Sequence, residues 1–349
     1  MTISPARARD LVEAIAKASG SPEAEAKGLA ENLVDANLTG HDSHGVSMLP
    51  LYIDMVRAGT MALGASPTVV METAATLLVD GNRGYGQTIM GQATDLLCAK
   101  AKKAGAAVLA LRNTHHIGRI GAWAERAARH GCASIFLVDV CGVDAKVAPH
   151  NGRDARLGTN PICFGFPRHG LPPVVADMAT SRVAVGKVRV ALNKGEAIPP
   201  GLVIDSEGKE STDPATMFRD PMGALLTMGE HKGYAISTML ELFAGALAGG
   251  MTIATLTPAE KRIVNNCVAV AIDPDAFGTR DTMTEEAGRL ETWLKASPPR
   301  GAAPVMLPGE PELEARRARA NGLPVDPGTW KLLVDLAASY GIDAGRHLD

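Results

Sequence analysis

The chain begins with apolar side chains at helical spacing, three or four residues apart. Ser4-Pro5 opens the first such stretch, and Ser21-Pro22 opens the second in the same way, because serine caps a helix and proline suits its first turn. A third apolar stretch runs from residue 48 to residue 58. The pattern therefore predicts three helices before residue 60.

From residue 66 the pattern changes to short apolar runs rich in β-branched side chains, which predict strands, separated by helical stretches. We expect strands at 68–71, 75–79, 106–111, 134–140, 174–176, 201–204 and 267–272. We expect helices at 88–104, 122–130 and 232–248. Helical spacing returns near the end of the chain, at 283–296, 311–320 and 328–340.

Helical ends therefore flank a mixed centre. We predict an α/β (α+β) fold with two lobes, in which a mixed or antiparallel sheet lobe, residues 66–280, is inserted in a helical lobe. Both ends of the chain, residues 1–65 and 281–349, would form that helical lobe. No Gly-x-Gly-x-x-Gly fingerprint and no P-loop occur, so neither a Rossmann phosphate turn nor a P-loop is predicted.

Composition is that of a globular protein, with 46% hydrophobic residues, 21% charged residues and a net charge of -3. Basic blocks and runs of 18 apolar residues are missing, so we expect no nucleic-acid partner and no membrane span. The first ten residues do not resemble a secretion signal. Five widely spaced cysteines without a C-x-x-C pair argue against a disulfide scaffold, and they indicate a reducing compartment. We therefore expect a cytoplasmic protein.

The first concentration of candidate chemistry lies at residues 41–45, just after a predicted helix. His41, Asp42, Ser43 and His44 follow one another there. An imidazole exchanges protons near neutral pH, and reduction of a ketone needs one proton at the carbonyl oxygen. The alternative is that Asp42 and Ser43 only cap the helix end and that both histidines are exposed.

A second concentration follows the strand predicted at 106–111. It contains His115, His116, Gly118 and Arg119, and strand ends are favoured positions for binding groups. Arg119 offers a fork of donors for a carboxylate or a phosphate. The alternative is a turn with one buried, satisfied histidine.

Metal binding is the rival use of these histidines. His41 and His44, with His115 and His116, could serve a metal-dependent hydrolase or lyase. However, adjacent histidines on a strand or turn point apart, and no His-Glu-x-x-His helix occurs. We predict no metal site.

Four further segments are candidate ligand contacts. The small-residue segments 154–161 and 176–181 are expected to be turns with free backbone amides. Lys232 opens a long apolar helix, where the helix dipole adds to its charge. The glycine-rich segment 81–86 is either a ligand contact or a tight surface turn. Ordinary turns and a solvated lysine are the alternatives for the other segments.

Taken together, these motifs resemble the type-2 malate/L-lactate dehydrogenase family, and most closely its hydroxycarboxylate dehydrogenase B branch. The resemblance covers nearly the whole chain. The motifs are HDSHG at 41–45, HHIGRIG at 115–121, LGTNP at 157–161, DMATS at 177–181, HKGY at 231–234, and ASPP with LPGEPE near 296–312.

The resemblance implies an oxidoreductase that uses NAD or NADP to interconvert a small 2-hydroxy acid and its 2-oxo acid. It also implies the family's own mixed, non-Rossmann sheet, with the cofactor bound by the sheet lobe of residues 66–280. The assembly it implies is a homodimer with the active site near the subunit interface. His44 matches the family's proton donor, His116 matches a second active-site histidine, and Ser43 would orient the first. The residues that match cofactor-contacting positions are His44, Gly118, Arg119, Ile120, Val175, Ala176, Asp177, Met178, Ala179, His231, Lys232, Asn266, Gly309, Glu310, Pro311 and Glu312.

The sequence departs from the family at Met48, where many relatives carry an arginine available to the substrate carboxylate. Arg119 is our replacement candidate for this anchor, with Tyr52 or Lys146 behind it. An altered stretch from Met251 to Asn265 is expected to reshape the mouth of the pocket.

Overall fold

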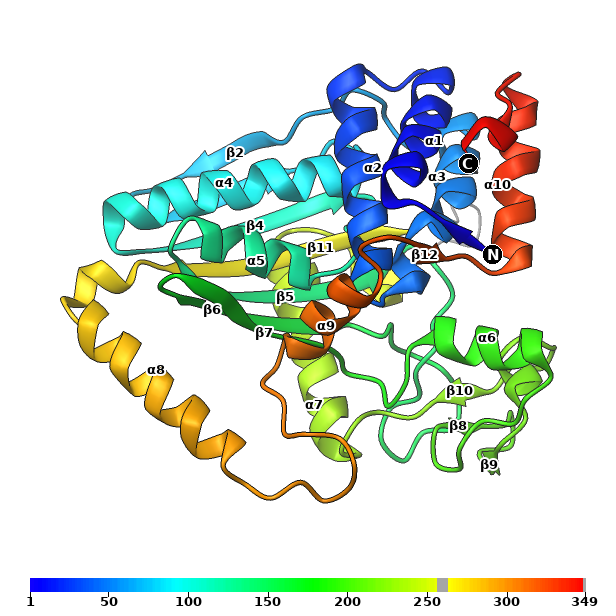
Figure 1. The fold of residues 1–349 in the computed structure, drawn as a ribbon. Helices are drawn as coiled ribbons and strands as arrows, with labels where there is room; N and C mark the ends of the chain where they lie inside the picture. The colour runs from blue at the N-terminus through cyan, green and yellow to red at the C-terminus, as the bar shows by residue number, and fades with distance from the viewer. Residues whose placement is uncertain (256–262, 348–349) are drawn as a thin grey trace.

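A seven-stranded mixed sheet forms the centre of the computed structural model, which describes residues 1–255 and 263–347 (Figure 1). Its strand order is β2-β3-β4-β11-β5-β6-β7, and β3 and β4 form its parallel pair among antiparallel neighbours. The strands are β2 (Thr68–Glu72), β3 (Thr76–Asp80), β4 (Ala106–Thr114), β5 (Ala133–Cys141), β6 (Pro161–Arg168), β7 (Leu171–Ala179) and β11 (Val264–Ile272). The predicted fold class is confirmed.

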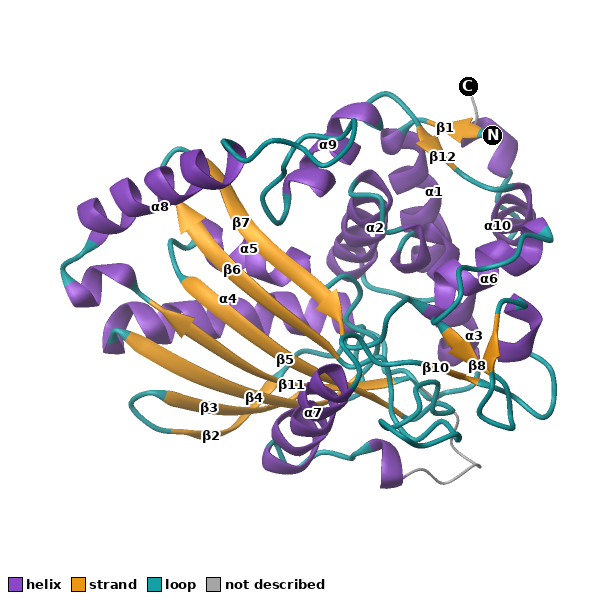
Figure 2. Cartoon of the chain, turned by 90° about the horizontal axis from the view of Figure 1, so that it is seen from below, coloured by secondary structure: helices purple, strands orange, loops and turns teal. Residues whose placement is uncertain are grey.

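Helices α4 (Gly86–Ala104) and α5 (Gly121–Arg129) cover one face of this sheet (Figure 2). Alternate residues of β4 show which face is buried, because Leu109 is fully buried whereas Val108 is 37% exposed. Helix α7 (His231–Leu240) continues into a π-helical turn, Glu241–Leu247, at one end of the other face. The rest of that second face is open.

Both ends of the chain contribute to one helical core beside the sheet, as predicted. Helices α1, α2, α3 and α10 pack together there (Figure 1). The two-stranded pair β1–β12 joins the two ends of the chain. These elements are α1 (Pro5–Ala18), α2 (Glu23–Leu38), α3 (Leu49–Arg57), α10 (Pro327–Ser339), β1 (Thr2–Ile3) and β12 (Leu323–Pro324).

Helix α8 (Arg280–Lys295) lies away from this helical core, at the edge of the large sheet (Figure 1). None of its residues is buried, and Glu291 pairs with Arg168 of β6 at 2.6 Å. Helix α9 (Glu310–Ala318) follows and packs beside α2. The lobe boundary at residue 281 stays a prediction.

A smaller sheet of three short strands stands apart from the large one. It consists of β8 (Val203–Ile204), β9 (Glu210–Ser211) and β10 (Ala224–Leu225), and α6 (Val185–Lys194) packs on its small core. The start of α6 comes close to the first histidine segment, since a Cβ at Gly186 would lie 2.5 Å from Ser43 Cβ. This contact places the small sheet beside the candidate site.

Two local predictions were wrong, and several elements were not predicted. Strand β6 and helix α6 were not predicted. Residues 176–181 are not a turn throughout, because Asp177 to Ala179 belong to β7. Ser21 does not cap α2, since the helix starts one residue later with Pro22 at its cap and no side-chain bond. Of the altered stretch, residues 256–262 lie outside the described residues, and β11 begins at Val264.

Two other expectations concern the described residues as a whole. All five cysteines are buried free thiols. Among the helices of the described residues, none has both the length and the apolar character to cross a bilayer.

Candidate active site

His44 is held by a short helical turn, Asp42–His44, that follows α2. The side chain of Asn37 fixes this turn, because its Nδ2 donates to Asp42 Oδ1 at 2.7 Å and its Oδ1 accepts from Val46 N at 2.8 Å. Ser43 Oγ lies 3.0 Å from His44 Nδ1. With Nδ1 engaged, Nε2 is the nitrogen of His44 that is left for a reacting group.

His116 lies beside His44, with 5.4 Å between the ring centroids and 24° between the ring planes. Its Nδ1 is 2.6 Å from the hydroxyl of Tyr52, which also accepts a bond from Gln87 Nε2 at 3.0 Å. Burial raises the pKa of Tyr52, so this hydroxyl keeps its proton and can donate it to Nδ1. His116 Nε2 then carries the ring proton.

Both imidazoles are neutral at pH 7 in this structure. Burial, with smaller contributions from His41 and Arg119, lowers the pKa of His44 to about 4. Burial and the neighbouring histidines lower the pKa of His116 to about 3. The other histidine of the pair at 115–116 turns away, and His115 Nε2 lies 2.9 Å from the carbonyl of Thr60.

The backbone of the second histidine loop is held by two asparagines of β11. Asn265 Oδ1 accepts from Ile117 N, and Asn266 Oδ1 accepts from Asn113 N, both at 3.0 Å. Asn266 in turn donates its N–H to Asp139 Oδ1 at 2.8 Å. Burial raises the pKa of Asp139 to about 8. Asn266 is fully buried with its side chain bonded inside the chain, so it supports the loop, and its contact with a cofactor stays a prediction.

The glycine-rich segment 81–86 also supports this loop. A Cβ at Gly86 would lie 2.2 Å from the carbonyl oxygen of His116, so only glycine allows α4 to begin this close to the histidine. The segment therefore packs against the candidate site through its backbone.

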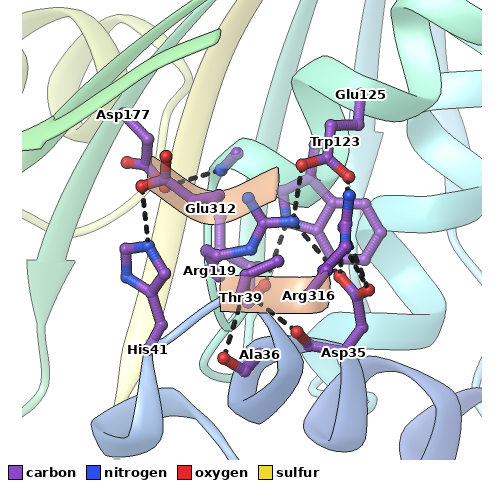
Figure 3. A network of polar contacts seen from close by, with 12 residues as sticks. Asp35, Ala36, Thr39, His41, Arg119, Trp123, Glu125, Asp177, Glu312 and Arg316 are labelled. Atoms are coloured by element: carbon purple, nitrogen blue, oxygen red, sulfur yellow. Dashed lines mark hydrogen bonds and ion pairs between the residues drawn. The ribbon is translucent and has the colours of Figure 1, made fainter. Parts of the chain in front are cut away.

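Arg119 is part of a buried ion-pair network that Figure 3 shows from close by. Its Nη2 contacts Asp35 Oδ2 at 3.2 Å and Glu125 Oε1 at 2.9 Å, and Arg316 bridges the same two carboxylates. Arg119 is 3% exposed, and its Nε has no partner among the described residues. The expectation that it anchors the substrate carboxylate is not supported, because its charge is already matched by two carboxylates.

A cavity of about 370 Å³ adjoins this network. Several predicted cofactor contacts line it: Arg119, Val175, Asp177, Gly309 and Glu312. Asp177 Oδ2 accepts from Gly121 N at 2.7 Å, and Glu312 Oε1 lies 3.2 Å from His41 Nε2. The structure thus brings together three segments that are far apart in sequence, and it links them to the first histidine segment (Figure 3).

Other predicted contacts are placed differently. Ala176 and Met178 alternate with Val175 and Asp177 along β7, so their side chains point to the opposite, open face of the sheet, where Met178 is 38% exposed. Ala179 shares the Asp177 side. Glu310 accepts from Leu307 N at 2.8 Å and pairs with Lys295.

The remaining predicted contacts lie on three segments. Gly118 has a positive φ of 71° beside the buried Ile120. Pro311 stands in the first turn of α9. His231 and Lys232 are exposed at the start of α7, away from the cavity lining.

Tyr52, a predicted substrate contact, is held inside the helical core. Tyr52 is 1% exposed and bonded to His116, so it positions that ring rather than reaching a substrate. Met48 packs against the helical core. Sequence reasoning missed Gln87, Asp139 and Asn265, because a lone polar residue in an apolar stretch carries no spacing signal.

The metal-dependent alternative is not supported. His41 is engaged with Glu312 and His115 with Thr60, so the four histidines do not converge. Within residues 1–255 and 263–347, no group of three or more His, Cys, Asp or Glu side chains is arranged to hold a metal ion.

Comparison with known proteins gives the same family as the motifs. The sequence profile of the malate/L-lactate dehydrogenase family matches residues 3–334. The chain is 43% identical to hydroxycarboxylate dehydrogenase B of Escherichia coli O157:H7 over 334 residues, 95% of this chain and 92% of that protein. It is 36% identical to an L-lactate dehydrogenase of Cupriavidus necator, over 98% of this chain and 99% of that protein.

Solved structures agree. A putative malate/lactate dehydrogenase from E. coli superposes with a TM-score of 0.95 at 41% identity, covering 99% of this chain and 97% of that one. Sulfolactate dehydrogenase from Methanocaldococcus jannaschii gives a TM-score of 0.88 at 30% identity, with 99% of each chain covered. The profile match and these identities extend over nearly the whole chain, so this protein belongs to the malate/L-lactate dehydrogenase family of oxidoreductases.

Proposed function

We propose that this protein is an NAD(P)-dependent dehydrogenase that interconverts a small 2-hydroxy acid and its 2-oxo acid. The observation that carries the proposal is the pair of neutral imidazoles, His44 and His116, close to a cavity lined by the family's cofactor-contacting segments. Relatives named for hydroxycarboxylates, L-lactate and L-sulfolactate support this substrate class.

The residues around the cavity fit a dinucleotide. Its volume of about 370 Å³ lies within the usual range of ligand sites. Arg119 Nε is a buried donor without a partner at this cavity, which suits a phosphate oxygen. Gly309 has a φ of 92°, and a Cβ there would lie 3.2 Å from Val175 N, so glycine keeps this wall open. When bound, the nicotinamide ring supplies or takes the hydride.

His44 is the group that moves the substrate proton in this proposal. In oxidation its neutral Nε2 accepts the hydroxyl proton, and in reduction the protonated ring returns a proton to the carbonyl oxygen. Ser43 holds the opposite nitrogen at 3.0 Å and so fixes the direction of Nε2. His116 presents its Nε2–H as a hydrogen-bond donor, because Tyr52 occupies its Nδ1. This donor would orient the same substrate oxygen.

The substrate carboxylate needs a cationic partner, and we assign this role to Lys146. Arg119 and Tyr52 are occupied by Glu125 and His116, whereas Lys146 forms no ion pair among the described residues. Lys146 precedes Val147, which shares the small core with α6, and α6 contacts Ser43 at Gly186. A Lys146→Ala change should raise the KM for the oxo acid more than Arg119→Ala does.

A panel of 2-oxo acids with NADH and NADPH, followed at the nicotinamide absorbance, tests the proposal. We expect turnover with at least one pair, and His44→Ala should lower kcat by about 10²–10⁴-fold because a positioned acid–base group contributes this much. Cofactor affinity should change little. His130→Ala is the matched control, since His130 is exposed and pairs with Asp95. Unaltered turnover in the His44 variant would contradict the assignment.

We also propose that two copies associate. The family resemblance implies a homodimer, and the open face of the large sheet supports one, because Val108, Phe164 and Met178 expose apolar surface there. The adjoining π-helical turn adds the exposed side chains of Leu242 and Phe243.

A further inference from the structure

We propose that the cavity between β7, α5 and α9 selects a cofactor with a phosphate on its adenosine 2′ position, and that Arg129 and Arg168 bind this phosphate. The inference rests on the proposed function, because it names which nicotinamide cofactor the same site takes. It predicts a preference for NADPH over NADH.

The cavity extends well beyond the histidine end. Asp177 and Leu171 both line it, and they stand six residues apart on β7, which corresponds to about 20 Å at 3.3 Å per residue. The Asp177 end is also lined by Glu312, which contacts His41. The Leu171 end lies beside the last turn of α5, where Arg129 stands. A dinucleotide whose nicotinamide lies near the histidines would therefore carry its adenosine toward Arg129.

Charges differ between the two ends. The carboxylates that line the cavity, Glu125, Asp177 and Glu312, all belong to the histidine end or to the ion-pair network beside it. At the far end the lining offers two arginines and no carboxylate, and Arg129 forms no ion pair with any described residue.

Arg168 is held at the same end of the cavity, and part of its guanidinium is left without a hydrogen-bond partner among the described residues. Its Nε donates to Pro172 O and its Nη1 to Glu291 Oε2, both at 2.6 Å, whereas its Nη2 has no bond to a described residue. Glu291 is shared with Lys295 at 2.7 Å, and Lys295 also contacts Glu310. Two cations therefore match two carboxylates here, which leaves the charge of Arg129 in excess.

This chemistry distinguishes the two cofactors. A free 2′-hydroxyl is usually recognised by an acidic side chain, whereas a 2′-phosphate is accommodated by arginine. An arginine fork matches phosphate geometry with two parallel hydrogen bonds. Pro172 and Pro173 follow Leu171 on β7, line the same end of the cavity and offer an apolar wall to an adenine ring.

Calorimetric titration with adenosine 2′,5′-bisphosphate and with 5′-AMP tests the inference without turnover. We expect the bisphosphate to bind at least about ten-fold tighter, as one charge-assisted hydrogen bond would give. Arg129→Ala should remove about ten-fold of this difference, and Arg129→Glu should remove more. Arg126→Ala is the matched control on the same helix, because Arg126 pairs with Asp95 and does not line the cavity.

Equal affinity for the two nucleotides, or an equal loss in the Arg126 and Arg129 variants, would overturn the inference. Turnover assays distinguish a failure of this inference from a failure of the proposed function. An equal or higher kcat/KM with NADH overturns the inference alone. Absence of turnover with either cofactor, in protein that still prefers the bisphosphate, overturns the proposed function and supports the phosphate site.

Discussion

At the scale of single residues, the protonation state of His44 governs the direction in which the site works best. Burial lowers its pKa to about 4, so near neutral pH the ring is ready to accept a proton from a hydroxy acid. Reduction needs the protonated ring. An oxo acid bound beside it brings a negative charge, which favours the imidazolium and raises the pKa of His44 in the complex.

The pH dependence of reduction and of oxidation follows from this pKa of His44. In reduction, kcat/KM should fall by about ten-fold per pH unit above pH 4, because it reports the free enzyme's His44. In oxidation, kcat/KM should rise up to about pH 4 and then stay level. The inflection of kcat for reduction should lie at higher pH than that of kcat/KM. Initial rates from pH 4 to 9 check this, and a flat reduction profile would exclude His44 as the proton donor.

Single residues also show how far the sequence can be interpreted. The two polar segments that contain Ser43, His44 and His116 were predictable, because short polar motifs stand out between apolar stretches, and the family resemblance implied that they share one site. The direction of each side chain was not, since His115 and His116 are chemically alike and only their bonds to Thr60 and Tyr52 separate them. For the same reason the sequence suggests Arg119 as a substrate anchor, because its carboxylate partners, Asp35 and Glu125, are apparent only in the fold.

At the scale of elements, the ion-pair network fastens α2, α5 and α9 together. Asp35 lies on α2, Glu125 on α5 and Arg316 on α9, and Arg119 precedes α5. Because these charges join three segments that are distant in sequence, the network orders one wall of the cavity. Its geometry is therefore a structural requirement for the cofactor site.

Arg119→Ala should lower the free energy of unfolding by about 3 kcal/mol, because it removes one partner from a buried ion-pair network. Urea unfolding followed by circular dichroism measures this. Arg289→Ala is the control, since Arg289 is exposed on α8, and it should change stability by less than about 0.5 kcal/mol. A loss below about 1 kcal/mol in the Arg119 variant would show that the network does not stabilise the fold.

Strand β6 shows why some elements escaped prediction. Its sequence contains Pro161, Gly165 and Pro167, residues that normally argue against a strand. Pro161 stands at the first position, and Pro167 lies where the register with β7 shifts. A Cβ at Gly165 would lie 2.9 Å from Ala124 Cβ of α5, so glycine admits the helix. The register shift and the close approach of α5 are visible only in the folded structure.

Helix α6 escaped for a related reason. Valines and Gly186 dominate its sequence, and both residue types disfavour helices. Within α6, Val188 is the fully buried residue, so the apolar stripe that normally reveals a helix is missing.

At the scale of the whole molecule, the open sheet face predicts the state of association. Light scattering after size-exclusion chromatography should give twice the mass of one chain. Phe164→Glu should shift the mass toward that of one chain, because Phe164 is 42% exposed on this face. Leu332→Glu is the control, since Leu332 is 55% exposed on α10. A single-chain mass for the unaltered protein, or an intact dimer in the Phe164→Glu variant, would contradict this interface.

The shared core of the two chain ends has a consequence for how the protein is made. Leu11 and Leu29 pack in the same cluster as Leu323 and Leu333, so the first helices leave the ribosome long before their partners exist. At 5–20 residues per second, the interval between them is roughly 15–60 s. Throughout that time the helical core formed by α1, α2 and α3 lacks the cover that β12 and α10 supply, and the nascent chain depends on chaperones or on temporary contacts to avoid aggregation.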